Sequence, residues 1–224
     1  MAFTNPTTPN LADFITFCQA QGVVAGYLDP LSPYFSWAFT HALDITISVP
    51  QMPSAEYVLA VYNLGMHWLV STAQDVSGLV IASLAWGNGA VIVTPAVALA
   101  FPVGQGLPVV IGGALPLAYN GCYSAQVISG TQFAYALEAN PGNATLPGVF
   151  GLQFFANLRK QFNLLSLVAG PVQSSHDAST GQTLVVPDFF KNLTFADLDL
   201  MKTPWGQRYL AYAQQYGPNI VDVS

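Results

Sequence analysis

The chain has few charged side chains for its length. They make up 7% of its 224 residues, and between Asp75 and Arg159 there is one, Glu138. A typical soluble domain contains about 25% charged residues. So little charge over so much apolar surface indicates that other subunits cover part of this protein's surface.

Basic residues are scarce and occur in one part of the sequence. Binding to nucleic-acid phosphates needs clustered Lys and Arg. Here the net charge is −6, and the five basic residues all lie in the last third: Arg159, Lys160, Lys191, Lys202 and Arg208. The sequence therefore argues against sequence-specific nucleic-acid binding.

We expect no membrane-spanning helix, no signal peptide and no disulfide framework. Residues 89–118 are uncharged, but prolines and glycines interrupt them, whereas a membrane-spanning helix needs about 20 consecutive apolar residues. The start, MAFTNPTTPN, shows no basic or apolar signal segment, so we expect synthesis in the cytoplasm. Cys18 and Cys122 are expected to be buried reduced thiols.

Sequence motifs for catalysis, cofactors and metals are missing. No Gly-Lys-Ser/Thr, Gly-x-Ser-x-Gly, Cys-x-x-Cys or His-x-x-x-His pattern occurs. We therefore predict no enzymatic activity, no cofactor and no metal. The most enzyme-like segment is Ser174–Asp177, which includes His176. Adjacent loop residues rarely converge as a nucleophile and its base must, so we favour a solvated loop over a hydrolase.

Two histidines and a basic pair have structural interpretations. His67 lies beside an apolar helical stripe, and His41 lies between Phe39 and an alanine. We expect both to be satisfied core or interface histidines rather than ligands. Arg159 and Lys160 are expected on a solvated helix face, with a salt bridge to a neighbouring subunit or a contact to DNA as alternatives.

Three segments before residue 78 show helical spacing. The first has Asn10 as its N-cap, Asp13 in its first turn and Gly22 just past its end. The second covers the aromatic residues of 31–46. The third covers 55–73, where apolar positions trace one face.

From Gly78 the pattern changes to short strands separated by turns. Gly87-Asn88-Gly89 and Tyr119-Asn120-Gly121 are tight-turn signals. Short strands with regularly spaced turns predict a small barrel or sandwich. Asn140-Pro141-Gly142 marks the end of these strands.

Helical character returns at residues 150–167 and again from Thr203-Pro204, with proline at the first helical position. The sequence thus predicts an α+β fold. A helical bundle domain, residues 1–77 plus 151–224, carries an inserted small all-β module, residues 78–150.

The helical flanks resemble the head-to-tail connector (adaptor) proteins of tailed bacteriophages. The resemblance rests on YVLAVYNLGMHWLVS (57–71), AGPVQSSHDASTGQTLVVP (169–187) and TPWGQRYLAYAQQYG (203–217), in the family's order. It implies a homo-oligomeric neck ring, of about twelve subunits, below the portal. DNA would pass through its lumen without specific binding, and a net acidic chain suits a channel that repels phosphates.

The connector resemblance also implies that the C-terminal segment contacts the portal protein. Aromatic residues and Arg are enriched at interfaces. The predicted docking residues are Trp205, Arg208, Tyr209 and Tyr212, with core positions for Trp205 and Tyr209 as the alternative.

The insertion resembles a small β module of phage tail and virion proteins. The family's His-Gly pair is absent and Gln105 replaces its usual acid, so the resemblance supports a fold and no binding role. The matching residues are Gly112, Gly113, Tyr119, Asn120, Gly121, Phe133 and Tyr135.

These resemblances lead us to expect a structural virion protein of the phage neck, assembled in the host cytoplasm. Its partners would be further copies of itself, the portal protein, and tail, stopper or terminator proteins. The alternative is a tail-fibre or surface carbohydrate-binding module that stacks sugars on Tyr119, Tyr123, Phe133 and Tyr135. Helices on both sides of the insertion argue against it, because fibre proteins are mostly β.

Overall fold

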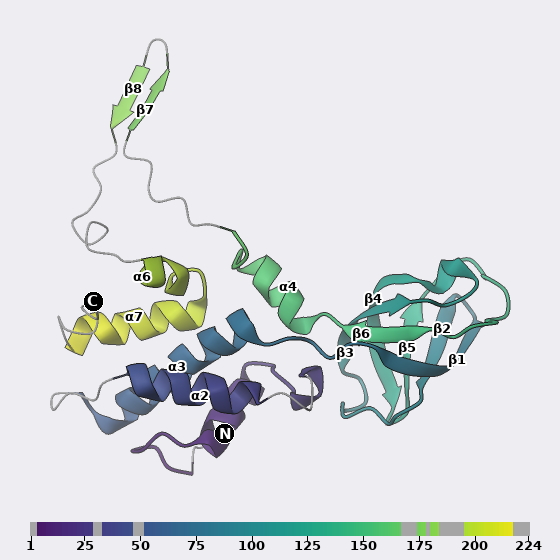
Figure 1. Cartoon of the computed structure of the whole chain (residues 1–224), viewed down its shortest axis with the longest axis horizontal. Coiled ribbons are helices and arrows are strands. Elements are labelled where there is room, and N and C mark those ends of the chain that lie inside the picture. The colour runs from purple at the N-terminus through teal and green to yellow at the C-terminus, as the bar shows by residue number, and fades with distance from the viewer. Residues whose placement is uncertain are drawn as a thin grey trace. The chain divides into compact units, whose positions relative to one another are not determined.

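The computed structural model describes residues 4–28, 33–46, 52–166, 174–177, 180–183 and 195–216. It combines helices with a closed six-stranded antiparallel β-barrel (Figure 1). The helices are α1 Leu11–Ala20, η1 Ala25–Tyr27, α2 Tyr34–Ile45, α3 Ser54–Thr72, η2 Leu117–Tyr119, α4 Phe154–Gln161, α6 Phe195–Leu200 and α7 Pro204–Tyr216. The strands are β1 Leu79–Gly87, β2 Ala90–Pro95, β3 Gly106–Gly112, β4 Gly121–Ser129, β5 Gln132–Ala136, β6 Val149–Leu152, β7 Ser174–Asp177 and β8 Thr180–Thr183.

The chain divides into two compact units. The helical unit comprises Met1–Thr16, Phe35–Ser71 and Arg159–Ser224, and the barrel unit comprises Phe17–Tyr34 and Thr72–Leu158. The barrel unit is thus larger than the 78–150 module expected from sequence, since it also takes in residues 17–34. The reason is packing: the Tyr27 ring stacks on Phe154, with centroids 4.2 Å apart.

The barrel closes in the strand order β1-β2-β5-β4-β3-β6, with every pair antiparallel. The turn predicted at Gly87-Asn88-Gly89 is confirmed. Asn88 and Gly89 have φ of 53° and 78°, which is the positive-φ pair that a two-residue hairpin turn requires. Gly87 pairs directly with Ala90 across it.

Alternate residues of the strands fill the barrel. Strand side chains point to opposite faces in turn, and the inward set is almost wholly apolar. The buried strand residues include Ile81, Leu84, Val91, Val93, Leu107, Val109, Ile111, Ala125, Val127, Phe133, Tyr135, Phe150 and Leu152.

The strand that closes the barrel was missed in the sequence. Residues 150–167 were expected to be helical, but Val149–Leu152 form β6, which pairs with both β1 and β3. Phe150 and Leu152 are buried while Gly151 between them is not. A four-residue alternation is too short to separate strand from helix by period, so only its two partner strands decide its form.

The structure at Tyr119-Asn120-Gly121 also differs from the tight turn that the sequence predicts. Asn120 is extended, with φ of −82°, and ends the short helix η2. Its side-chain amide donates to the Ala114 carbonyl oxygen at 2.9 Å and accepts from the Ala114 N–H at 2.8 Å. Asn120 therefore closes a loop through its side chain rather than making a hairpin through positive φ.

The helix-end signals of α1 are confirmed. The Asn10 Oδ1 accepts the Asp13 N–H at 2.9 Å, which is an N-cap bond. At the other end Gly22 has φ of 92°, and the Val23 N–H donates to the Cys18 carbonyl oxygen at 3.0 Å. This is the Schellman arrangement for which glycine is preferred.

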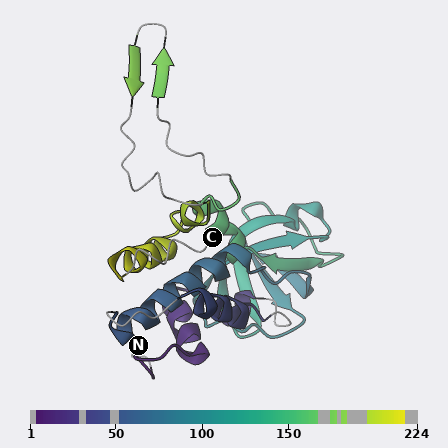
Figure 2. The same ribbon diagram turned by 60° about the vertical axis from the view of Figure 1, so that its left-hand side comes forward.

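In the helical unit, α2 and α3 lie side by side in both views (Figure 1, Figure 2). The Phe14 ring packs against Phe35, Phe39 and Tyr62, with centroids 5.7 to 6.4 Å apart. Residues 60–67 of α3 are all buried. The sequence predicts one apolar face for this helix, but residues 60–67 are buried on every face. This part of α3 therefore lies within the core of the helical unit.

The two thiols are free but differ in exposure. Cys18 is buried, as expected, and burial raises its pKa. Cys122, on β4, is exposed, which corrects the expectation of two buried thiols. It is one of the outward residues of a strand whose inward residues fill the barrel.

Candidate functional site

The Ser174–Asp177 segment forms β7, paired with β8 in a hairpin. Its side chains, including that of His176, lie outside the described part of the structure. The hydrolase alternative therefore stays untested.

A buried polar cluster instead surrounds His67 of α3, which is 1% exposed. Its Nδ1 lies 2.8 Å from the Thr203 Oγ1, and its Nε2 lies 3.4 Å from an Asp199 carboxylate oxygen. Lys202 Nζ lies 3.0 Å from the other Asp199 oxygen and donates to the Ser166 carbonyl at 2.8 Å. His67 is thus a satisfied core histidine, as predicted.

The groups that face the two ring nitrogens indicate which nitrogen of His67 carries the proton. Thr203 Oγ1 accepts the Gly206 N–H at 3.0 Å and so caps α7. The Asp199 carboxylate can only accept a hydrogen bond, which places the ring proton on Nε2 and leaves Nδ1 to accept from the Thr203 hydroxyl. Burial lowers the His67 pKa and outweighs the opposing effect of the Asp199 carboxylate, so the ring is neutral near pH 7.

This Thr–His–Asp cluster joins α3 to α6 and α7. Thr203 is fully buried and its hydroxyl is engaged on both sides. A nucleophile needs access to substrate and a base that takes its proton. Thr203 and His67 are 136 residues apart, so no local sequence pattern could have indicated the contact.

Of the four predicted portal-docking residues, the structure leaves two at the surface. Trp205 is 7% exposed and Tyr209 4%, so both belong to the core of the helical unit. The Trp205 ring packs edge-on against Phe162, with centroids 5.5 Å apart. Arg208 is exposed and Tyr212 is half-buried. Aromatic residues suit cores and interfaces equally, which is why the sequence left both readings open.

The two basic residues of α4, Arg159 and Lys160, also differ in exposure. Arg159 Nη1 donates to the Val70 carbonyl oxygen at 3.1 Å, near the end of α3. A cation at a helix C-terminus satisfies a carbonyl and the helix dipole. The expectation of a solvated face therefore fails for Arg159, whereas Lys160 is exposed.

The aromatic residues proposed to stack on sugars are mostly interior. Tyr119, Phe133 and Tyr135 are at most 2% exposed. Tyr123 is half-buried and stacks on Tyr135, with centroids 4.0 Å apart. The carbohydrate-binding alternative thus loses three of the four residues on which it was based.

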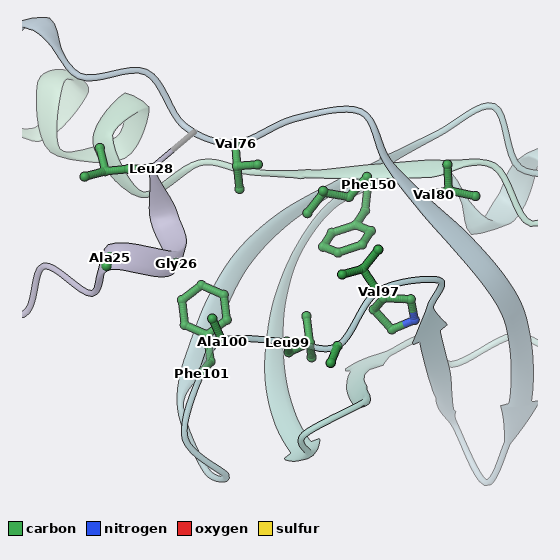
Figure 3. A pocket seen from close by; sticks show the side chains of 13 residues that line it. Ala25, Gly26, Leu28, Val76, Val80, Val97, Leu99, Ala100, Phe101 and Phe150 are labelled. Carbon is green, nitrogen blue, oxygen red and sulfur yellow. The ribbon is translucent and has the colours of Figure 1, made fainter. Parts of the chain in front are cut away.

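The barrel unit contains an apolar pocket of about 320 Å³. It lies between η1 and the segment that follows β2, and the rings of Phe101 and Phe150 point into it (Figure 3). No lining side chain carries a polar group. The lining residues are Ala25, Gly26, Leu28, Val76, Leu79, Val80, Pro95, Val97, Ala98, Leu99, Ala100, Phe101 and Phe150.

Backbone and side-chain bonds hold the walls of this pocket in place. The Val76 N–H donates to the Tyr27 carbonyl oxygen at 2.9 Å, and the Tyr27 hydroxyl donates to the Gly106 carbonyl at 3.2 Å. The Leu99 N–H donates to the Gly130 carbonyl at 2.8 Å. These hydrogen bonds therefore fix the positions of the chain segments that line the pocket.

The outside of the barrel unit is apolar as well. Nine of the thirteen exposed large hydrophobic residues found in the described chain belong to it: Val80, Ile92, Val97, Val103, Leu115, Leu117, Ile128, Leu146 and Val149. Residues 72–158 contain no Lys or Arg. Val80 and Val97, which are 59% and 73% exposed, also line the pocket.

Within the described residues, no group of three or more His, Cys, Asp or Glu is placed to hold a metal ion. None of the described helices is both long and apolar enough to cross a membrane. Comparison with protein-family models, with curated proteins and with solved structures found no match.

Proposed function

We propose that this chain is a structural protein of a tailed-bacteriophage neck. In this proposal it is a connector that assembles below the portal and joins the DNA-filled head to the tail. Its helical unit corresponds to the connector domain, and its barrel is a module inserted between α3 and α4.

The observation that carries the proposal is the exposed apolar surface of the barrel unit. A protein working as a monomer rarely exposes much contiguous apolar surface. Here nine large hydrophobic residues are exposed on a unit in which residues 72–158 carry no Lys or Arg. Such a surface suits a protein that spends its working life covered by neighbours in an assembly.

The exposed side of α7 is the proposed portal contact. Arg208 is exposed and Tyr212 half-buried, one turn apart on the same helix. An Arg and a Tyr of this kind are typical anchors of an interface. Trp205 and Tyr209 would support the contact from within by fixing α7 in the helical unit.

The test is binding to portal rings isolated from the same particle, followed by electron microscopy. Added density on the portal is expected with the wild-type chain and lost with Arg208→Glu. Gln214→Glu adds an acid at another exposed position of α7 and should bind as wild type does. Wild-type protein that adds no density to portal rings contradicts the proposal.

A further inference from the structure

The apolar pocket of the barrel unit selects for a neutral partner group. Every lining side chain is apolar. The barrel unit, residues 17–34 and 72–158, contains no Lys or Arg that could neutralise a carboxylate or phosphate. An anionic lipid headgroup or a phosphorylated ligand therefore has no counter-charge here. The chemistry fits an uncharged apolar side chain.

The chain carries a matching side chain on its helical unit. Trp37 of α2 is 62% exposed, and it is the one aromatic residue among the exposed large hydrophobics of the described chain. Tryptophan is enriched among the residues that dominate binding energy, and such residues insert into desolvated pockets. A cavity of about 150 Å³ is enough for benzene, so the pocket of about 320 Å³ accommodates the larger indole.

We propose that Trp37 of one copy inserts into the apolar pocket of a second copy. Each copy then offers an exposed indole on one unit and an apolar pocket on the other. Such a head-to-tail contact can repeat from copy to copy and makes a ring if the rotation closes. The inference rests on the proposed function in one respect, namely that the chain works as an assembly.

The first test places a charge at the pocket. Val97→Glu puts a carboxylate on a residue that is 73% exposed and lines the pocket. Val103→Glu is the matched control: it is 69% exposed, lies in the same β2–β3 connection and does not line the pocket. We expect Val97→Glu to weaken self-association about thirtyfold, as loss of a binding hot spot does, and Val103→Glu to leave it unchanged. Sedimentation velocity measures both.

The second test removes the projecting side chain and then mixes the variants. Trp37→Ala should dissociate the oligomer, whereas Ile45→Ala, at another exposed position of α2, should not. Trp37→Ala keeps the recess and Val97→Glu keeps the tryptophan. Mixing these two monomers should therefore give a one-to-one dimer that cannot grow.

Three results of these two tests would overturn the inference. They are a wild-type chain that stays monomeric at every concentration, association unchanged by Trp37→Ala, and no dimer on mixing. Indole added to monomeric Trp37→Ala should bind and shift the nuclear magnetic resonance signals of the pocket residues, and no shift counts against it. Portal binding is measured separately, so rings that persist in Trp37→Ala on portal would refute this contact and leave the connector function standing.

Discussion

Replacing Thr203 by valine removes the hydroxyl that joins α7 to His67 while keeping the shape of the side chain. Loss of the N-cap bond to the Gly206 N–H costs about 1 kcal/mol. The fully buried Nδ1 of His67 also loses its partner, which costs about 1–3 kcal/mol. We therefore expect Thr203→Val to lower the free energy of unfolding by about 2–4 kcal/mol.

Urea unfolding followed by circular dichroism measures this loss. With a slope m of about 2 kcal/mol/M, the midpoint should fall by about 1–2 M while m stays the same. Thr203→Ser is the control, since it keeps both hydrogen bonds and loses one buried methyl group, at about 1 kcal/mol. Equal destabilisation by valine and serine would refute the hydrogen-bond argument and leave packing as the explanation.

The same cluster predicts a dependence on pH. Burial holds the folded-state pKa of His67 below its ordinary value of 6.5, against the pull of Asp199. Below about pH 6.5 the unfolded chain therefore binds a proton that the folded chain does not, so stability falls as pH falls towards the folded-state pKa. His67→Gln should flatten this part of the profile. A wild-type profile that rises on acidification would contradict a neutral His67.

Three further predictions rest on single side chains. In urea unfolding, Gly206→Ala should lower the free energy of unfolding by more than about 1–3 kcal/mol, because the added Cβ would overlap the backbone at the end of α6. Gly130→Ala is the control: its Cβ meets open space, and it should cost under about 1 kcal/mol. Of the two thiols, Cys122 alone should react with a thiol reagent in the folded protein, and modification of Cys18 at the same rate would contradict its burial. Burial raises the Asp13 pKa, but hydrogen bonds from its neighbours lower it to about 2. The stability that this carboxylate contributes is therefore present above pH 3.8 and lost as pH falls through about 2. If Asp13→Asn leaves the acid side of the stability–pH profile unchanged, this argument is refuted.

Features set by neighbouring residues could be predicted from the sequence. Asn10 and Gly22 bound α1 because capping depends on a few backbone groups within one turn. Asn88-Gly89 makes its hairpin turn because the needed φ angles suit those two residues. The closing strand β6 could not be read in this way, since four residues take their form from partners about 40 and 70 positions away.

Side-chain positions show the same limit. The sequence leaves Trp205 and Tyr209 between an interface and the core, and they lie in the core of the helical unit. Whether these two side chains are buried depends on which elements pack against α7, and the amino-acid composition does not show this. The Asn120 turn differs for a related reason, because its side chain bonds to Ala114 across a loop. The connector resemblance itself stays a prediction.

The sequence by itself determined that this protein is nearly uncharged over residues 76–158, with turns spaced for short strands and helical segments on both sides. Composition and local turn geometry depend on neighbouring residues alone, so they can be predicted without knowing which distant residues pack together. Only the tertiary structure decided that the strands close into a barrel, that His67 meets Thr203, and that Val97 and Phe150 line one apolar pocket. Each of these depends on residues far apart in the chain, which come together when burial of apolar surface selects one arrangement of the backbone.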